Sequence, residues 1–372
     1  MERIRIGDAC DILNGYAFKS DKYVEKGIRV IRIANVQKGY IEDNAPVFYP
    51  LDFSGLEKYM LEEGDLLMSL TGNVGRVALI QRNMLPAALN QRVACLRLRS
   101  NRITKGFLFH ILNSDLFEQQ CVQASNGVAQ KNMSTEWLRD YEIPLYSMEE
   151  QLKITEILDK TRRIIDLRNY ELSVLDDLIK ARFVEMFGDP VCNPLRWEKK
   201  TLKEVCIKLN DGTHFSPESF ETGEYKYVTA KNIKMSGFDF TNITYVPEEV
   251  HRPIYERCNP ELGDVLYIKD GVTTGIAMVN TLEEEFTLLS SVALLKQDRR
   301  IMNGHFLSAL LNDENMYTDI RSNMGGAAIT RLTIAKLNTI KVILPPIELQ
   351  TQFAAFVEQT NKSKFHTEEN II

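Results

Sequence analysis

The sequence has few of the features that mark an enzyme, a secreted protein or a membrane protein. Its 372 residues include six cysteines and no C-x-x-C pair, which favours reduced thiols over a disulfide framework or a zinc site. Neither glycine-rich phosphate loop, G-x-x-x-x-G-K-[ST] or G-x-G-x-x-G, is present, and the five histidines lack the spacing of metal ligands. The sequence therefore requires no catalytic residue, bound metal or cofactor, although its abundant Asp and Glu leave a hidden metal-dependent nuclease site open.

Long apolar segments are also missing. No run approaches the roughly 18–20 residues of a membrane span, and the N-terminal Met1-Glu2-Arg3-Ile4-Arg5 has no signal-peptide core. We therefore expect a cytoplasmic protein that does not enter a membrane. A chain of this length suggests two to three domains, each large enough for its own core.

The chain repeats itself at a constant offset of 199 residues. Gly106-Phe-Leu matches His305-Phe-Leu, and Gly64-Asp-Leu-Leu matches Gly263-Asp-Val-Leu. Copies of roughly two hundred residues are too long for solenoid units, so they indicate a tandem duplication of a globular domain. A duplicated domain suggests a protein that binds two similar sites at the same time.

Charge is unevenly distributed along a chain whose formal net charge is −6. Two stretches, 66–114 and 320–347, contain no Asp or Glu. One interpretation is a strand-rich segment whose Arg stems cover apolar surface. The other is one basic face per domain on an otherwise acidic body. The cations in the two stretches are Arg76, Arg82, Arg92, Arg97, Arg99, Arg102, Lys105, Arg321, Arg331, Lys336 and Lys341.

The hydrophobic patterns predict a mixed α/β (α+β) fold in each copy. Residues 28–33 and 93–98 alternate like strands, 107–121 has helical periodicity, and Ser134 precedes a short capped turn. We expect two similar globular domains, 1–148 and 191–347. A long helix follows each of them, over 149–190 and 348–372.

Apolar residues in both helices recur at coiled-coil spacing, so we predict that the helices pair as an antiparallel coiled coil. The alternative is two independent helices, each docked on its own domain. The second helix is short. We therefore expect a partner within the chain only near 154–161, and a distal half that is exposed or covered by another subunit. The pairing residues are Ile154, Leu158, Ile165, Leu172, Leu175, Ile179, Phe353 and Val357.

Polar loops recur at matching places in the two copies. Their glycines allow close backbone approach, and Asn, Gln, Arg, Lys and Thr are the side chains that contact base edges and phosphates. Polar turns of an ordinary soluble protein are the alternative. The candidate DNA contacts are Lys19, Thr71, Asn73, Arg76, Gln91, Arg92 and Lys131 in the first copy, and His214, Lys231, Lys269, Thr274 and Arg331 in the second.

Two copies, each closed by a pattern of the form I-P-L-x-x-x-E-x-Q and a helix, resemble the specificity subunit of type I restriction–modification systems. The pattern stands at 143–151 and 342–350, and the resemblance covers nearly the whole chain. It implies two target recognition domains that each recognise one half of a split, asymmetric site in double-stranded DNA. It also implies a non-catalytic chain whose helices form a spacer that docks two methyltransferase subunits. Motor–nuclease subunits would join them, and these partners would use S-adenosylmethionine, ATP and magnesium.

Two alternatives remain open at this point. The same module could serve a fused methyltransferase–nuclease, or it could be a scaffold that binds proteins rather than DNA. The short C-terminal helix departs from the family pattern. The sequence gives neither the bases recognised nor the gap between the half-sites.

Overall fold

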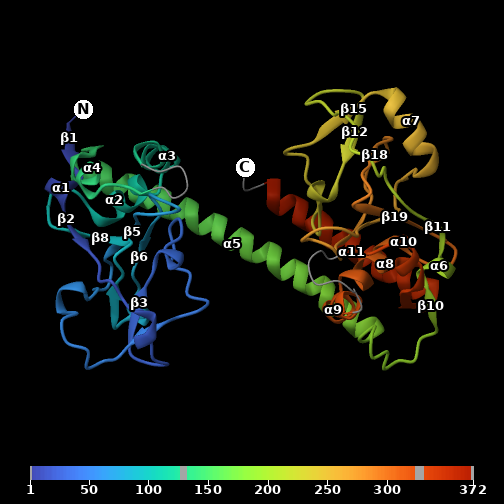
Figure 1. The fold of residues 1–372 in the computed structure, drawn as a ribbon, viewed down its shortest axis with the longest axis horizontal. Coiled ribbons are helices and arrows are strands. Elements are labelled where there is room, and N and C mark those ends of the chain that lie inside the picture. The colour runs from blue at the N-terminus through green and yellow to red at the C-terminus, as the bar shows by residue number, and fades with distance from the viewer. Residues whose placement is uncertain (1, 126–131, 323–330, 370–372) are drawn as a thin grey trace. The chain divides into compact units, whose positions relative to one another are not determined.

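The computed structural model describes residues 2–125, 132–322 and 331–369, with side chains as far as 364. The chain divides into two compact units, Met1–Ile164 (unit 1) and Ile165–Ile372 (unit 2) (Figure 1). The long helix α5, Met148–Phe187, begins in unit 1 and ends in unit 2. The division between the two units therefore falls within α5.

Unit 1 is built on a four-stranded sheet of order β2-β8-β5-β6, with a three-stranded sheet β4-β3-β7 and a pair β1-β9. Its strands are β1 Arg3–Arg5, β2 Cys10–Asn14, β3 Ile28–Ile31, β4 Phe48–Tyr49, β5 Leu66–Ser69, β6 Val77–Leu79, β7 Ala87–Leu89, β8 Val93–Leu98 and β9 Glu142–Pro144. Its helices are α1 Ile6–Ala9, α2 Lys105–Leu112, α3 Asp115–Ala124 and α4 Thr135–Asp140, with short 3-10 turns η1 Ser20–Lys22, η2 Ile33–Asn35, η3 Glu57–Tyr59 and η4 Arg82–Met84.

Unit 2 repeats this topology in the sheets β11-β19-β16-β17, β15-β12-β18 and β10-β20, and adds the hairpin β13-β14. Its strands are β10 Lys199–Thr201, β11 Cys206–Asp211, β12 Tyr225–Val228, β13 Ile233–Lys234, β14 Gly237–Phe238, β15 Thr244–Val246, β16 Val265–Ile268, β17 Ala277–Val279, β18 Thr287–Leu288, β19 Val292–Gln297 and β20 Lys341–Ile343. Its helices are α6 Leu202–Val205, α7 Glu248–Arg257, α8 Gly304–Asn312, α9 Glu314–Ser322, α10 Ile334–Thr339 and α11 Ile347–Glu369, with a 3-10 turn η5 Ala230–Asn232.

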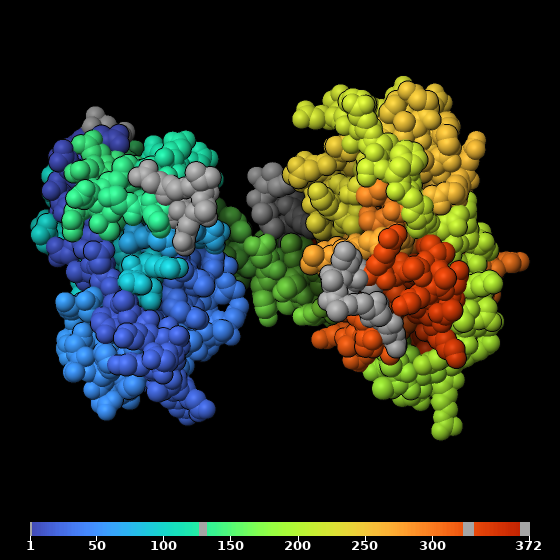
Figure 2. All heavy atoms as spheres, viewed as in Figure 1, coloured from blue at the N-terminus to red at the C-terminus, as the bar shows by residue number. Residues whose placement is uncertain are grey.

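The register of the main sheet repeats as well. Leu66 of β5 lies opposite Leu96, and Val265 of β16 lies opposite Leu295, so both pairs keep the offset found in the sequence. In unit 2 the three-stranded sheet and α7 gather at one end, and helices α8 and α10 with β10 gather at the other (Figures 1 and 2).

Apolar cores cover both faces of each main sheet. In β5, Leu66 and Met68 belong to the core that packs on helices α2 to α4, whereas Leu67 belongs to the core shared with the second sheet. In β16, Val265 and Leu266 divide in the same way. Alternate side chains of a strand point to opposite faces, so these central strands bury side chains on both faces.

Two predicted elements differ from the structure. The strand expected over 28–33 ends at Ile31, where a 3-10 turn follows. The helix expected over 107–121 is two helices, because the Ser114 hydroxyl accepts a hydrogen bond from the Phe117 amide at 3.2 Å and starts α3 afresh. The capped turn at Ser134 is confirmed, since its hydroxyl accepts from the Glu136 amide at 3.1 Å.

A fully buried glutamine fixes the first turn of α5 to unit 1. The Gln151 side-chain oxygen accepts from the Thr104 amide at 2.8 Å. Its nitrogen donates to the Arg102 carbonyl at 2.8 Å and to the Tyr146 carbonyl at 2.9 Å. The glutamine of the recurring E-x-Q pattern is thus a structural anchor.

Gln350 does the same for α11 in unit 2. It accepts from the Asn303 amide at 2.9 Å and donates to the carbonyls of Ile301 at 3.0 Å and Pro345 at 2.7 Å. Each of its partners corresponds to a partner of Gln151 at the same offset of 199. The duplication therefore preserved a complete buried hydrogen-bond set, in which each polar group has its partner.

Helix α11 packs antiparallel on the C-terminal end of α5. The Phe353 ring lies 5.7 Å from that of Phe183 and 5.6 Å from that of Phe187, measured between centroids. Further along α11, Lys364 forms an ion pair with Asp176, so residue numbers rise in one helix as they fall in the other.

The antiparallel pairing is therefore confirmed, but the expected place of contact was wrong. The distal half of α5, which we expected to lack a partner, is the half that α11 covers. Because α11 runs antiparallel to α5, the first turns of α11 lie beside the last turns of α5, and a short α11 therefore covers only the C-terminal half of α5. Ile154, expected at the contact, instead packs into the core of unit 1. Of the other pairing residues, Ile179, Phe353 and Val357 belong to the core of unit 2, Leu172 and Leu175 are half-buried, and Leu158 and Ile165 are exposed.

Replacing Gln350 by alanine tests the anchor. The substitution leaves one amide and two carbonyls without their partner, so the free energy of unfolding of unit 2 should fall by at least about 2 kcal/mol. The two tryptophans report separately, Trp137 in unit 1 and Trp197 in unit 2. Urea unfolding followed through Trp197 fluorescence, in a Trp137→Phe background, should show an earlier midpoint. The exposed Gln352→Ala is the matched control, and an equal midpoint for both variants would contradict the anchor.

Candidate nucleic-acid interface

Four loops of unit 1 meet at one edge of its main sheet. The Gln91 amide donates to the Tyr16 carbonyl at 3.0 Å, and the Leu70 amide donates to the Arg92 carbonyl at 3.0 Å. The Met133 amide donates to the Leu70 carbonyl at 2.9 Å, next to a bridge between Thr71 and Asn132. We call residues 14–18, 70–76, 90–92 and 132–133 the loop cluster of unit 1.

The equivalent loops of unit 2 meet through equivalent bonds. The Ser290 amide donates to the Thr213 carbonyl at 2.8 Å, and the Lys269 amide to the Ser291 carbonyl at 2.9 Å. The Leu332 amide donates to the Lys269 carbonyl at 2.9 Å. Residues 211–215, 269–276, 289–291 and 331–332 form the loop cluster of unit 2. In unit 1 the loops that follow β2 and β5 lie beside the loop that precedes β8, and in unit 2 the loops that follow β11 and β16 lie beside the loop that precedes β19. The end of one strand and the start of its antiparallel neighbour lie at the same edge of a sheet.

One glycine in each cluster permits this convergence. A side chain at Gly15 would overlap the backbone of Asn90, and a side chain at Gly212 would overlap the carbonyl of Leu288. Only glycine allows the first loop to approach the third so closely. The recurring glycine in the loops near each start therefore has a steric cause.

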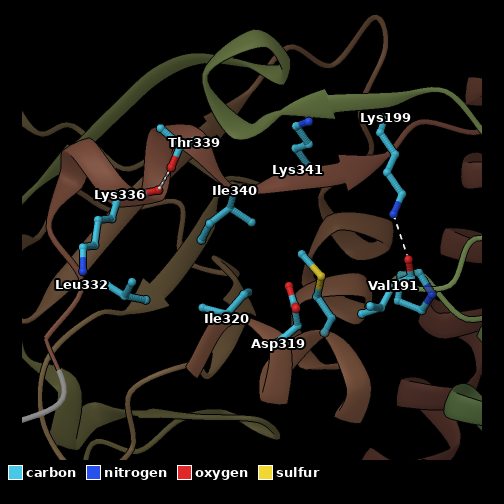
Figure 3. A pocket seen from close by; sticks show the side chains of 11 residues that line it. Val191, Lys199, Asp319, Ile320, Leu332, Lys336, Thr339, Ile340 and Lys341 are labelled. Atoms are coloured by element: carbon cyan, nitrogen blue, oxygen red, sulfur yellow. Dashed lines mark hydrogen bonds between the residues drawn. The ribbon is translucent and has the colours of Figure 1, made fainter. Parts of the chain in front are cut away.

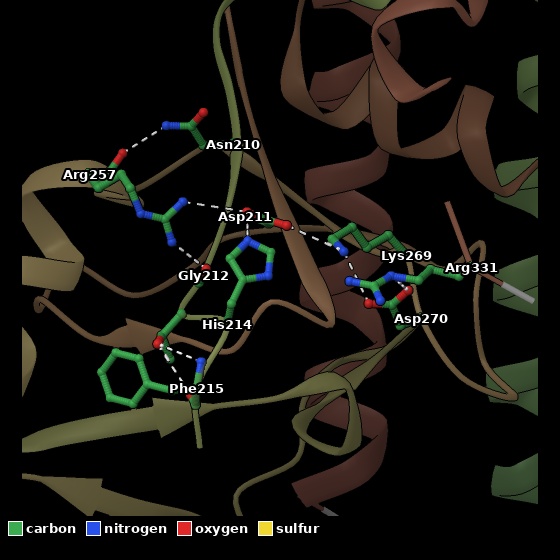
Figure 4. A network of polar contacts seen from close by, with 10 residues as sticks. Asn210, Asp211, Gly212, His214, Phe215, Arg257, Lys269, Asp270 and Arg331 are labelled. Carbon is green, nitrogen blue, oxygen red and sulfur yellow. Dashed lines mark hydrogen bonds and ion pairs between the residues drawn. The ribbon is translucent and has the colours of Figure 1, made fainter. Parts of the chain in front are cut away.

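Alternating charges join three loops of unit 2 (Figure 4). The buried carboxylate of Asp211 lies 3.3 Å from the Lys269 ammonium and 3.5 Å from the Arg257 guanidinium. Lys269, whose side chain is 2% exposed, also lies 3.0 Å from Asp270, which pairs with Arg331 at 3.2 Å. Each buried charge thus has a partner of opposite sign, as burial requires.

The cluster of unit 1 has no such chain of charges at these positions. Asn14 pairs with Ala94 in the sheet as Asp211 pairs with Ala293, and Leu70 follows β5 as Lys269 follows β16. An amide and an apolar side chain therefore replace the buried carboxylate and ammonium. The two units share a scaffold but differ in the chemistry of their loops.

Most of the predicted contacts lie on or beside the clusters with their side chains accessible. Thr71 and Arg76 are half-buried, and the Arg76 side chain donates to the Gln37 amide oxygen. Lys131 lies outside the described residues. The exposed residues are Lys19, Asn73, Gln91, Arg92, His214, Lys231 and Arg331.

The structure corrects the expected position of two residues. Lys269 is buried in ion pairs, and Thr274 is buried with its hydroxyl donating to the Gly271 carbonyl at 2.6 Å. Neither presents its side chain to a partner outside the chain, so both instead hold the loop in shape. A loop sequence does not distinguish an inward polar side chain from an outward one, and the buried carboxylate that draws Lys269 inward comes from a distant strand.

Several arginines of the long acid-free stretch of unit 1 form ion pairs with acidic residues from outside the stretch. Arg97 forms an ion pair with Asp65 that raises its pKa, and Arg99 lies 3.4 Å from Asp11. Arg102 pairs with Glu2. Arg82 and Arg92 form no ion pair with any described residue. The accessible positive charge of this stretch is therefore confined to fewer residues than the sequence suggested.

Sequence reasoning also missed one residue of the candidate interface. Arg257 donates to the Gly212 carbonyl and pairs with Asp211, but it comes from the end of α7, where unit 1 has only the short 3-10 turn η3. Matched polar strings were the signal used to find loop residues, and none of these strings includes Arg257.

A cavity of about 600 Å³ opens elsewhere in unit 2 (Figure 3). At its counterpart in unit 1, Trp137 and Tyr141 pack together, with ring centroids 5.0 Å apart, whereas unit 2 has Lys336 and Ile340. Unit 2 thus lacks these two rings beside its cavity. The labelled lysines around it do not converge, and Lys199 already donates to the Val191 carbonyl at 2.9 Å.

Within the parts of the chain that the structure describes, no three His, Cys, Asp or Glu residues are grouped to hold a metal ion. None of the described helices is long and apolar enough to cross a bilayer.

The chain belongs to the family of the type I restriction modification DNA specificity domain, whose model matches residues 1–176 and 194–372. It is 32% identical over 216 residues to the type I restriction enzyme EcoAI specificity subunit of Escherichia coli, covering 56% of this chain and 32% of that protein. It is 30% identical over 177 residues to the MjaVIII specificity subunit of Methanocaldococcus jannaschii, covering 46% of this chain and 41% of that one. The chain thus spans about a third to two fifths of the length of these relatives.

Another relative matches along most of both chains. The EcoBI specificity subunit of Escherichia coli is 23% identical over 385 residues, covering 96% of this chain and 78% of that protein. The crystal structure of a type I restriction–modification S subunit from M. genitalium superposes with a TM-score of 0.59 at 15% identity, covering 100% of this chain and 91% of that one. This likeness shows that the two proteins share a fold.

Replacing Lys269 by methionine tests whether this buried lysine stabilises the loop, in contrast to the exposed Arg331. The change removes the buried ammonium that contacts both the buried Asp211 and the half-buried Asp270, and leaves these carboxylates with more exposed partners such as Arg257 and Arg331. Unit 2 should therefore lose about 3 kcal/mol of stability. Arg331→Ala removes a side chain that is 56% exposed and should change stability by less than about 1 kcal/mol. Urea unfolding followed through Trp197 measures both, with the exposed Lys231→Met as control. A wild-type midpoint for Lys269→Met would show that its ion pairs do not support the loop.

Proposed function

We propose that this chain is the DNA-specifying subunit of a type I restriction–modification complex, in which each loop cluster recognises one half of a split target. One observation carries the proposal: the same four polar loops converge at the same sheet edge in both units of a chain whose family model matches twice. The exposed side chains there include Asn73, Gln91 and Arg92 in unit 1 and Arg331 in unit 2. Such amides and guanidinium groups hydrogen-bond base edges and phosphates.

The two half-sites differ in sequence, because the two clusters differ in chemistry. Asn14 and Leu70 in unit 1 stand where Asp211 and Lys269 stand in unit 2. The target is therefore asymmetric. Each domain alone binds weakly, and the pair binds tightly because tethering raises the effective concentration of the second domain.

The partners in this proposal are two methyltransferase subunits and, for restriction, motor–nuclease subunits, working in the cytoplasm. Four apolar side chains on the middle of α5, Leu167, Tyr170, Val174 and Leu178, are exposed. Exposed apolar surface of this kind marks a contact with another protein. The partners would bind S-adenosylmethionine, ATP and magnesium, and this chain would supply specificity alone.

Arginine-to-alanine substitutions in one cluster should affect one half-site. In the complex with the partner methyltransferase, Arg92→Ala should change the requirement at one half of the methylated target, and Arg331→Ala the requirement at the other. A lost base contact costs about 1–3 kcal/mol and relaxes its own position, whereas a lost phosphate contact weakens binding to all sequences and reduces its salt dependence. Methylome mapping and binding at several salt concentrations measure the two effects.

The exposed Arg139→Ala, on α4 and outside the clusters, is the control. Binding that does not weaken with salt would favour a protein-binding scaffold, because phosphate neutralisation always gives a salt dependence. An unchanged target and unchanged affinity for both arginine variants would place the interface elsewhere.

The purified chain should neither methylate nor cleave DNA. Methyl transfer should begin only when a partner methyltransferase and S-adenosylmethionine are added, since the described residues offer no grouped metal ligands and the sequence no cofactor loop. Incorporation of a tritiated methyl group into DNA measures this. Transfer by the chain alone, at a rate proportional to its concentration after removal of every other subunit, would refute a purely specifying role.

A further inference from the structure

The loop between β16 and β17 carries a solvent-exposed valine. Val272 is 94% exposed, the highest value among the exposed large apolar side chains of the described residues. It lies in the loop cluster of unit 2, two residues after Asp270, which pairs with the exposed Arg331 (Figure 4). An isolated aliphatic side chain in water gains nothing for the fold, and its exposure leaves the isopropyl group free to contact a partner of this polar cluster.

This loop is held in shape from within. The Thr274 amide and hydroxyl both donate to the Gly271 carbonyl, at 3.2 and 2.6 Å. Gly271 and Gly275 have φ values of +102° and +114°, which other residues rarely adopt. A side chain at Gly275 would also overlap the Tyr317 ring. Val272 is thus presented by a braced turn, and little conformational entropy is lost when it contacts a partner.

Unit 1 has a different residue at the same place. The loop of unit 1 has two residues between its glycines, Gly72 and Gly75, and the loop of unit 2 has three; counted from the first glycine, the exposed Asn73 stands where Val272 stands in unit 2. The strands before the loops correspond, and the closing bonds correspond too. The Gly75 amide donates to Ser69 as the Gly275 amide donates to Ile268. The position after the first glycine therefore carries an amide in unit 1 and an isopropyl group in unit 2.

The two side chains suit different base edges. An amide can make two hydrogen bonds to adenine in the major groove, whereas an apolar group can contact the 5-methyl group of thymine. Valine offers no donor or acceptor, so it distinguishes thymine from the other bases by the methyl group alone.

We propose that Val272 is a specificity-determining residue that contacts the 5-methyl group of a thymine in the half-site recognised by unit 2. This inference rests on the proposed function, because it requires the loop cluster of unit 2 to face DNA. It adds the base, the groove and the atom that are recognised.

The test removes the methyl group and the valine separately. The target is first mapped by methylome sequencing. Duplexes then carry deoxyuridine in place of each thymine of the unit 2 half-site in turn, which deletes only the 5-methyl group. The complex of the full chain with its methyltransferase should bind one of these duplexes about fourfold more weakly than the natural target, as expected for one buried methyl group.

Val272→Ala should bind the natural target more weakly and should bind the thymine and uracil duplexes equally, so that the fourfold ratio falls to one. Val272→Thr, which keeps one methyl group, should keep part of the ratio. Val24→Ala shortens a partly exposed valine of unit 1 and is the matched control, for which the ratio should stay at about four.

Three results would overturn the proposal: a unit 2 half-site without thymine, no thymine sensitive to methyl removal, or a Val272→Ala variant that keeps the fourfold ratio. In each of these the complex still binds its mapped target in a salt-dependent manner, so the proposed function stands. Failure of the wild-type complex to bind the mapped target in preference to a scrambled duplex would instead refute the proposed function.

Discussion

The antiparallel four-stranded sheet of each unit is the constraint on which the rest of the structure depends. Its central strands, β5 and β16, are buried on both faces, so their register is fixed by two cores at once. Because neighbouring strands run in opposite directions, the loops after β2 and β5 adjoin the loop before β8 at one edge, and the equivalent loops of unit 2 do the same. The candidate interface follows from this arrangement. The loops can change in sequence between copies while the sheet holds their backbones in place.

Buried polar side chains hold the neighbouring helices and strands of each unit in place. Gln151 and Gln350 tie the following helix to its own unit through hydrogen bonds whose partners are preserved in the duplication. Asp65 and Asp264 are likewise buried, and each pairs with a cation of the neighbouring strand, Arg97 or Lys296. An unpaired group at any of these places would be costly, so they vary little between the copies. Variation is concentrated in the loop clusters, where the units differ in charge, as at the buried Asp211, and in polarity, as at the exposed Val272.

Repetition made much of the fold predictable. Matched strings located two domains and two helices, the alternation of apolar residues located strands such as 93–98, and the motif at 143–151 indicated the family. The same strings located the loops of the candidate interface, because the loops lie beside strands that are themselves repeated. Arg257 and the inward direction of Lys269 escaped prediction for one reason. Both depend on the carboxylate of Asp211, which is distant in sequence and comes close only when the strands pair.

By itself, the sequence determined the duplication, the mixed α/β class, the existence of a long apolar-striped helix and the segments in which polar loop residues gather. These are properties of local spacing and composition, which a chain carries before it folds. Only the tertiary structure decided which end of α5 receives α11, which arginines of the acid-free stretch are neutralised, and which loop side chains point outward. Each of these depends on contacts between residues far apart in the chain. Phe353 meets Phe187, Arg97 meets Asp65 and Lys269 meets Asp211, because the sheet register and the antiparallel direction of the helices bring them together.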